Sequence, residues 1–362
     1  MKGRLALVAM AIAGAGTLAA CGSAAPATST QQSQQPVSAP LATSVSTARD
    51  SWALLPMAAS PAFWQVFVRP ATSQAWRLVT PPGVADNGGL VAAGTGGTLT
   101  VAIRPSQDLT FSPLATSANG GAAWRTGLLD ADIASAPSAL AASGSQLLAL
   151  LDNGAIMASS NAGGTWRTLA AAGALAGSPA GRECGALGVT DVSFGVSQGE
   201  VLAAGTCGAA SSAVFAYSAG SWRQVSLPVS GRVVRMLPGV ALVASGSQLY
   251  AAWDTPSGWS ASAPLAAGSV EASGGFGTGG AWVLLPDHRA ATIVGPGQPW
   301  RTLGAVPEGT TVLALGPDGA VDALAVGGSQ LDKLTVWRLG GSATAWSSVQ
   351  TIDVPIQVGS SS

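Results

Sequence analysis

Seven tryptophans recur along this chain at near-regular intervals, and this repeat limits the possible folds more than any other feature of the sequence. Most of these indoles are followed by a polar residue and then by a short stretch of strand-like composition. The successive spacings are 48, 42, 56, 37, 41 and 46 residues, with a mean of 45. The seven are Trp76, Trp124, Trp166, Trp222, Trp259, Trp300 and Trp346. A period of this length indicates a chain of repeated supersecondary units, each with one indole at an equivalent position.

The segments between these tryptophans read as short strands joined by tight turns. Asn153-Gly154 stands between two apolar runs, which is a strong hairpin signal. The Ala-rich stretch Leu169–Ala176 is expected to form a loop, because Gly173 interrupts it and Pro179 follows it. Repeats of roughly 40–50 residues built from strands are typical of propeller folds. We therefore predict an all-β chain with a seven-bladed β-propeller over residues 51–358; six or eight blades would also fit if a weak repeat is miscounted.

Two of the segments before a repeated tryptophan share a spaced pattern of small polar residues and glycine. The first consists of Ser117, Asn119, Gly121 and Trp124, and the second of Ser159, Asn161, Gly163, Thr165 and Trp166. This pattern resembles the Asp-box, or BNR repeat, of sialidases, sortilin-type receptors and Ycf48-like assembly factors, with Asn in place of Asp. The resemblance implies a turn between the third and fourth strands of a blade. Ser and Asn side chains fix such turns by bonding backbone N–H groups, and the tryptophan is expected to pack between blades.

The N-terminus has the pattern of an export signal. A basic start, Met1–Arg4, precedes the apolar run Leu5–Leu18, and this run is too short to span a membrane. Leu18-Ala19-Ala20-Cys21 resembles a bacterial lipobox, so we expect residues 1–20 to be removed and Cys21 to carry lipid; a plain secretory signal is the alternative. Residues 21–50 hold no aromatic residue, and we expect a flexible tether. The tail 359–362 is also expected to be disordered.

Two further cysteines, Cys184 and Cys207, remain if Cys21 is lipidated. Outside the cytoplasm such a pair usually oxidises, so we predict a disulfide that joins the first two strands of the fourth blade; two buried free thiols are the alternative. A metal site is less favoured, because His288 is the only histidine. The first blade lacks a strand in this reading, and we expect the C-terminal strand at Thr351–Val358 to complete it and so close the ring.

Composition narrows the function classes. Only 9% of the residues are charged and the formal net charge is -1, so a basic nucleic-acid binder is excluded. We expect no cofactor and no metal; calcium loops at Asp152 or Asp318 lack the spaced carboxylates that such a site needs. Trp64 and Trp337 lie outside the repeat register and are the candidates for exposed aromatic residues.

The resemblance also raises one enzymatic alternative, a sialidase-like glycoside hydrolase. That family uses several Arg with a Tyr nucleophile, and here the candidates are Arg104, Tyr217 and Tyr250. Fold alone does not imply this activity. We therefore expect a monomeric, lipid-anchored protein on the extracytoplasmic face of a bacterial cell membrane. It would serve, without catalytic residues, as a binding or assembly platform for an envelope protein, a peptide or a glycan.

Overall fold

The computed structural model describes residues 42–47, 49–58, 63–81, 90–95, 98–103, 112–125, 131–133, 135–197, 199–208, 211–268, 273–277, 280–316 and 319–355. All of them belong to one compact unit, Gln35–Ser362. Among these residues no helix is long and apolar enough to cross a membrane. Cys21 and the predicted signal segment lie outside the described residues.

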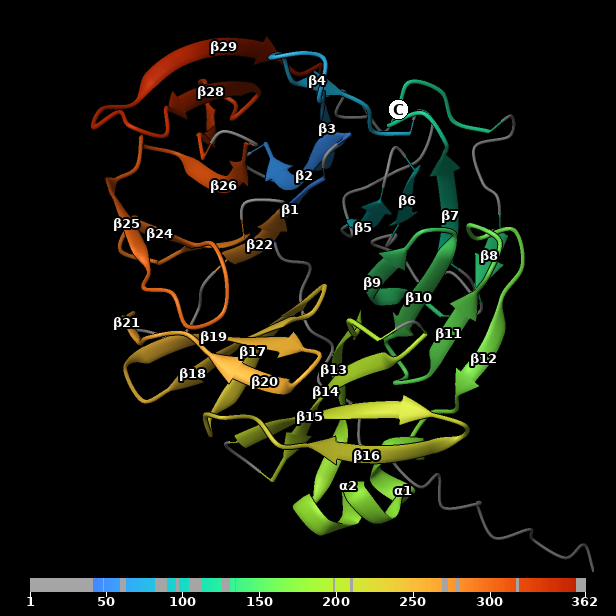
Figure 1. Ribbon diagram of the computed structural model, residues 1–362. Helices are drawn as coiled ribbons and strands as arrows, with labels where there is room; N and C mark the ends of the chain where they lie inside the picture. Colours follow the sequence, from blue (N-terminus) through green and yellow to red (C-terminus); the bar gives the residue numbers. More distant parts are fainter. Residues whose placement is uncertain are drawn as a thin grey trace, which may run out of the picture. The chain divides into compact units, whose positions relative to one another are not determined.

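The described strands fall into successive groups of four, each an antiparallel meander that we call a blade (Figure 1). Blade 1 holds β1 (Thr43–Ser46), β2 (Asp50–Met57), β3 (Phe63–Pro70) and β4 (Arg77–Leu78). Blade 2 holds β5 (Leu90–Thr95), β6 (Thr98–Ile103), β7 (Ser112–Ser117) and β8 (Ala131–Ile133). Blade 3 holds β9 (Pro137–Ser143), β10 (Gln146–Leu151), β11 (Ile156–Ser159) and β12 (Arg167–Ala170). Blade 4 holds β13 (Ala186–Phe194), β14 (Val201–Cys207), β15 (Ser211–Ser218) and β16 (Ser221–Val225).

The remaining blades follow the same plan. Blade 5 holds β17 (Arg232–Leu237), β18 (Val240–Ser245), β19 (Gln248–Thr255) and β20 (Gly258–Ala261), with the short β21 (Leu265–Ala266) paired to β19. Blade 6 holds β22 (Ser273–Gly277), β23 (Gly280–Leu284), β24 (Arg289–Ile293) and β25 (Arg301–Ala305). Blade 7 holds β26 (Thr310–Leu315), β27 (Val321–Gly327), β28 (Lys333–Leu339) and β29 (Ser347–Asp353).

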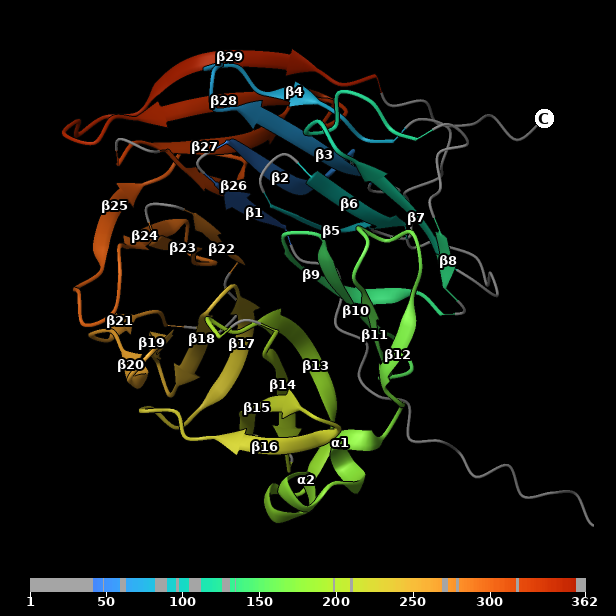
Figure 2. The same ribbon diagram turned by 45° about the vertical axis from the view of Figure 1, so that its right-hand side comes forward.

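The first strand of each blade contacts the neighbouring blade, and these contacts close into a ring. β5 lies against β2 and β9, and the series continues through β13, β17, β22 and β26 back to β1 and β2 (Figure 2). In such a ring the outermost strand of each blade, such as β29, remains a sheet edge. The chain is therefore a β-propeller, as its tryptophan period predicts.

The first blade obtains its inner strand from an unexpected part of the chain. β1 lies in the segment that we expected to be tether, so the folded part begins earlier than residue 51. It pairs antiparallel with β2 and parallel with β22, where Val45 lies opposite Phe276. The C-terminal β29 pairs with β28, so the expectation that Thr351–Val358 completes the first blade is wrong for its described residues. A strand from the supposed tether already occupies the position that the C-terminal strand would have taken.

The repeated tryptophans stand at equivalent places in the blades. Where the outermost strand is described beside them, each precedes or begins that strand, and each packs into an apolar cluster shared by neighbouring blades. Trp124 of blade 2 donates its indole N–H to Val79 O at 2.9 Å, and Trp300 of blade 6 donates to Ala263 O at 3.1 Å. Both acceptors follow the last strand of the preceding blade. These two indoles thus fill the gap between two sheets and are each fixed by one hydrogen bond across it.

The two box segments form matching turns. In the second box, Asn161 Oδ1 accepts from Thr165 N and from Ser159 Oγ, both at 2.9 Å, while Ser159 Oγ accepts from Gly163 N at 2.9 Å. Ser117, Asn119 and Gly121 make the equivalent bonds in the first box, where Asn119 Oδ1 accepts from the Ala123 N. In these turns the Asn amide oxygen therefore accepts the hydrogen bonds that a carboxylate oxygen could accept.

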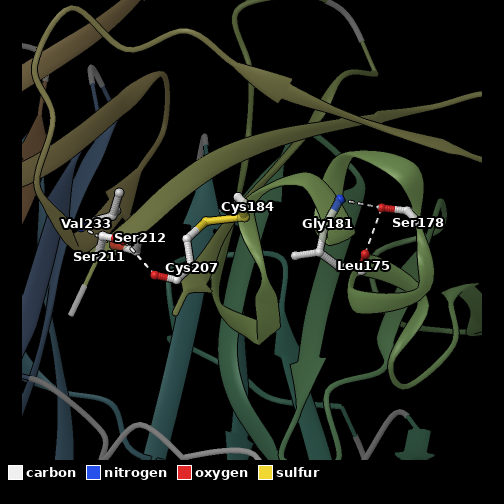
Figure 3. The surroundings of a disulfide bond; sticks show 8 residues. All are labelled: Leu175, Ser178, Gly181, Cys184, Cys207, Ser211, Ser212 and Val233. Atoms are coloured by element: carbon white, nitrogen blue, oxygen red, sulfur yellow. Dashed lines mark hydrogen bonds between the residues drawn. A yellow bond between two sulfur atoms is a disulfide. The ribbon is translucent and has the colours of Figure 1, made fainter. Parts of the chain in front are cut away.

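Blade 4 is preceded by two short helices, α1 (Ala174–Gly177) and α2 (Pro179–Cys184). The helix α1 begins within Leu169–Ala176, where we expected a loop, and α2 follows that stretch. Pro179 does not oppose the second helix, because it occupies the first turn, where no N–H partner is required. Ser178 caps that helix by accepting from Gly181 N at 2.9 Å. The predicted disulfide between Cys184 and Cys207 is present (Figure 3). It joins the end of α2 to the end of β14, so the expectation that it joins the first two strands of the blade is wrong for Cys184.

Blades 7 and 1 meet at a buried ionic cluster that no sequence pattern predicted. The Asp322 carboxylate, 1% exposed, accepts from Arg69 Nη1, from Trp76 Nε1 at 2.9 Å and from Arg338 Nε at 2.7 Å. The Arg69 guanidinium also stands over the Trp76 ring, 5.3 Å from its centroid. Burial lowers the pKa of Arg69, whereas the hydrogen bond to Asp322 raises the pKa of Arg338. We call this cluster the seam.

Candidate functional site

A cavity of about 550 Å³ lies where the first strands of the blades end, a volume within the range of about 300–1,000 Å³ typical of ligand pockets. Most of its lining comes from β1, β5, β9, β13, β17 and β22 and from the turns that follow several of them, and β2, β19 and β23 add Trp52, Trp253 and Gly280. None of the described residues of β26 lines it, because β1 pairs with β22 on that side of the ring. The first strands of six blades therefore converge on one central site.

The walls of this cavity are mainly apolar. Phe194, Met236 and Phe276 line it from three successive blades. Two of its lining residues, Val196 and Val294, are 51% and 71% exposed, respectively, and belong to the few large apolar side chains that the described surface presents to water. Apolar side chains at a cavity lead us to expect a ligand with an apolar body.

Four polar side-chain atoms of the cavity lining lack protein partners. The atoms are Ser46 Oγ, Trp52 Nε1, Arg235 Nε and Trp253 Nε1, all buried and unpaired within the described part of the chain. Trp52 is 4% exposed and Trp253 is 9% exposed. Three of these four atoms are N–H donors. A buried donor without an acceptor carries a desolvation cost, which a ligand with acceptor atoms would remove.

Arg235 is the one charged residue among those that line the cavity, and the buried Asp191 interacts with it electrostatically. Both oxygens of that carboxylate are used by the backbone: Oδ2 accepts from Met236 N at 2.8 Å and Oδ1 from Val192 N at 2.9 Å. Burial raises the pKa of Asp191, and the attraction of Arg235 opposes this shift. Asp191 therefore acts on the guanidinium through charge, and the structure gives no hydrogen bond from it to Arg235 Nε.

The residues considered for a hydrolase do not gather at this cavity. Tyr217 donates its hydroxyl to Leu169 O at 2.8 Å and packs against Trp222 between blades, and Tyr250 donates to Gln248 Oε1 at 2.6 Å. Arg104 lies outside the described residues. The hydrolase alternative is not favoured, since the lining offers one arginine and no carboxylate.

The remaining candidate residues lie apart from the cavity. Trp64 and Trp337 are partly buried against the packed cores and are not the exposed aromatic residues that we expected. His288 stands in the turn between β23 and β24 with φ of 60°. Asp152 follows β10, and Asp318 lies outside the described residues. Within the described ranges no group of three or more His, Cys, Asp or Glu residues could hold a metal ion.

Sequence reasoning missed all four unpaired groups of the cavity. Trp52 and Trp253 differ from the repeated tryptophans in register, because they lie inside β2 and β19 rather than at the start of an outer strand. That difference in register was a usable signal. No sequence signal marked Arg235, because a lone arginine in a strand is usually a surface residue.

Comparisons with known proteins bear on the fold. No family model matches the chain, and no curated protein matches it. Among solved structures, YCF48 from Cyanidioschyzon merolae is 14% identical with a TM-score of 0.51, and the match covers 80% of this chain and 94% of that one. A candidate 6-phosphogluconolactonase from Bacteroides uniformis is 11% identical with a TM-score of 0.53, covering 84% and 97%. A protein from Lactobacillus plantarum is 12% identical with a TM-score of 0.52, covering 85% and 97%. At these identities the similarity establishes the β-propeller fold and carries no activity or ligand over to this chain.

Proposed function

We propose that this protein is a binding platform, without catalytic activity, whose partner inserts an apolar segment into the central cavity. The observation that carries the proposal is the cavity itself, which is lined by six blades, has mainly apolar walls and holds a single charged side chain. Non-enzymatic binding fits this lining better than glycoside hydrolysis, which requires a pair of carboxyl groups or their equivalents.

A protein or peptide segment suits the site better than a glycan. The exposed valines Val196 and Val294 offer apolar contact beside the cavity. Trp52 and Trp253 are too deeply buried to present their faces to a sugar ring. The partner is therefore expected to contribute apolar side chains, with polar atoms that meet the unpaired N–H groups below.

A photo-crosslinking amino acid placed at Val294 in living cells tests this proposal, with Val349 on β29 as the matched control. Both valines are exposed, but only Val294 lines the cavity. We expect a discrete protein adduct at Val294 that is absent at Val349. Identical adducts at both positions, or none at Val294, would refute the assignment of the cavity as the binding site.

We further propose that Cys21 carries lipid and holds the propeller at the extracytoplasmic face of a bacterial membrane. The support is the lipobox-like Leu18–Cys21 after a short apolar run. A clickable palmitate analogue should label the wild-type chain and leave the Cys21→Ser chain unlabelled. Equal labelling of both would rule out Cys21 as the lipid site.

A further inference from the structure

The unpaired donors of the cavity define the ligand more narrowly than its apolar walls do. Every buried polar group in a folded protein is normally hydrogen-bonded. Half of the unpaired buried polar atoms in the described part of the chain line this one cavity. A cluster of unsatisfied donors in one place indicates an acceptor that the isolated chain does not itself contain.

Two of these donors share a face of the same sheet. In blade 5, Leu237 pairs with Val240 and Val240 pairs with Trp253, so these three side chains project from one face. Arg235 lies two residues before Leu237 in β17 and therefore on that face as well. Arg235 and Trp253 thus project from the same face of blade 5, and both line the cavity.

The surroundings of these two residues fit an anionic acceptor. Arg235 is the one charged residue that lines the cavity, and its guanidinium and the Trp253 indole N–H on the same face offer donors without an acceptor. The oxygens of Asp191 are already bonded to two backbone N–H groups. The Trp253 ring packs at 6.2 Å against Phe276, so the apolar wall begins directly beside the donors.

We propose that the cavity binds an amphipathic carboxylate, with the carboxylate held by Arg235 and the Trp253 indole and the apolar body packed against Phe194, Met236 and Phe276. The inference rests on the proposed binding function and names its ligand class. The chemistry is shared by two sources, a free acyl acid and the C-terminal carboxylate of an apolar peptide.

The test uses the compact unit Gln35–Ser362, which contains every described strand, in calorimetric titrations without detergent. Decanoate and its neutral counterpart decanol form one pair of probes, and N-acetyl-trileucine with its C-terminal amide forms the other. We expect each acid to bind about 10- to 100-fold more tightly than its neutral partner, the usual gain from charge-assisted hydrogen bonds. The pair with the larger difference identifies the source.

Matched variants locate the site. Arg235→Gln should weaken acid binding by a similar factor, whereas Arg223→Gln, whose guanidinium is 68% exposed on β16, should leave it unchanged. Trp253→Phe keeps an aromatic ring but removes the N–H together with the five-membered ring, so it should weaken binding a few-fold. Trp166→Phe makes the same change at another unpaired N–H away from the cavity and should not weaken binding. Melting curves must first show that each variant is folded.

An NMR measurement distinguishes a change in binding from an effect of the substitutions on folding. The indole N–H resonance that disappears in the Trp253→Phe variant should shift when decanoate is added and stay fixed with decanol. Equal affinities for acid and neutral probes, no binding by any probe, or an Arg235→Gln variant that binds like wild type would overturn the proposal. If one of those results were found while the crosslink at Val294 still formed, the proposed binding platform would still hold. If the crosslink at Val294 were absent as well, both the ligand proposal and the binding platform would be refuted.

Discussion

Replacement of Asp322 by alanine should unfold this ring more readily than any other single change to a charged residue of the described part. The carboxylate accepts from four N–H groups: Arg69 Nη1, Trp76 Nε1 at 2.9 Å, and the Nε and Nη2 of Arg338 at 2.7 and 3.1 Å. Alanine removes all four bonds at once. It also leaves the Arg69 guanidinium, in a residue that is 7% exposed, without its counter-charge.

The size of the effect follows from this burial. Removal of one partner of a buried ion pair costs about 3–5 kcal/mol, because the remaining charge is neither solvated nor paired. An exposed ion pair in the same blade provides the comparison. Lys333 Nζ lies 3.3 Å from Asp353 Oδ1, and the two side chains are 52% and 81% exposed. Such surface pairs contribute about 0–1 kcal/mol. Asp353→Ala is therefore the matched control for Asp322→Ala.

Urea unfolding followed by tryptophan fluorescence provides the assay, and the free energy of unfolding is compared among the three proteins. We expect a loss of about 3–5 kcal/mol for Asp322→Ala and less than about 1 kcal/mol for Asp353→Ala. Replacing Arg69 by methionine together with Asp322 by leucine should recover part of the loss, since an apolar pair carries no desolvation cost. Equal losses for the two alanine variants would show that the seam does not hold blade 7 to blade 1.

Three further predictions concern the turns, the disulfide and pH. Asn161→Ala should lower the free energy of unfolding by about 1–2 kcal/mol through the lost bond to Thr165 N, whereas Asn161→Asp should be nearly neutral; urea unfolding of both variants decides this. Reduction of the Cys184–Cys207 disulfide, which spans 23 residues, should cost about 3 kcal/mol, measured by unfolding with and without reductant. Burial raises the pKa of Asp191, so the stability from this group is complete below its unfolded pKa and is lost as pH rises through the folded pKa. The free energy of unfolding of Asp191→Asn, relative to that of the wild type, should therefore increase as the pH rises from acidic to neutral. A difference that stays constant with pH would contradict this.

Much of the blade plan was predictable because it depends on local chemistry repeated along the chain. A turn such as Ser159–Thr165 is closed by its own side chains, and Asn153-Gly154 forms a hairpin turn between adjacent strands. The disulfide was predictable because Cys184 and Cys207 are the two cysteines that remain beside Cys21. The helix α2 was missed because Pro179 was taken as a breaker when its position in the first turn makes it compatible with a helix.

The first blade and the cavity were not predictable in the same way. Thr43–Ser46 has no aromatic residue and follows a polar stretch, so nothing local marks it as a strand. It becomes β1 because β2 and β22 supply hydrogen-bonding partners on both sides, and because Ser44 accepts from Trp282 Nε1 at 2.9 Å and donates to Leu313 O at 2.5 Å. Except for β2, these partners lie more than 200 positions away in the sequence.

The sequence by itself therefore determined the repeated unit, its turns and the indole at each outer strand, since each of these is decided by residues within one period. Only the tertiary structure decided how the ring closes and which groups line its central cavity. The pairing of β1 with β22, the burial of Asp322 between two arginines and the unpaired donors of Arg235 and Trp253 all arise where separate blades meet. Burial and hydrogen-bonding partners at such places depend on which distant surfaces come together, and the spacing of residues along a chain does not encode that.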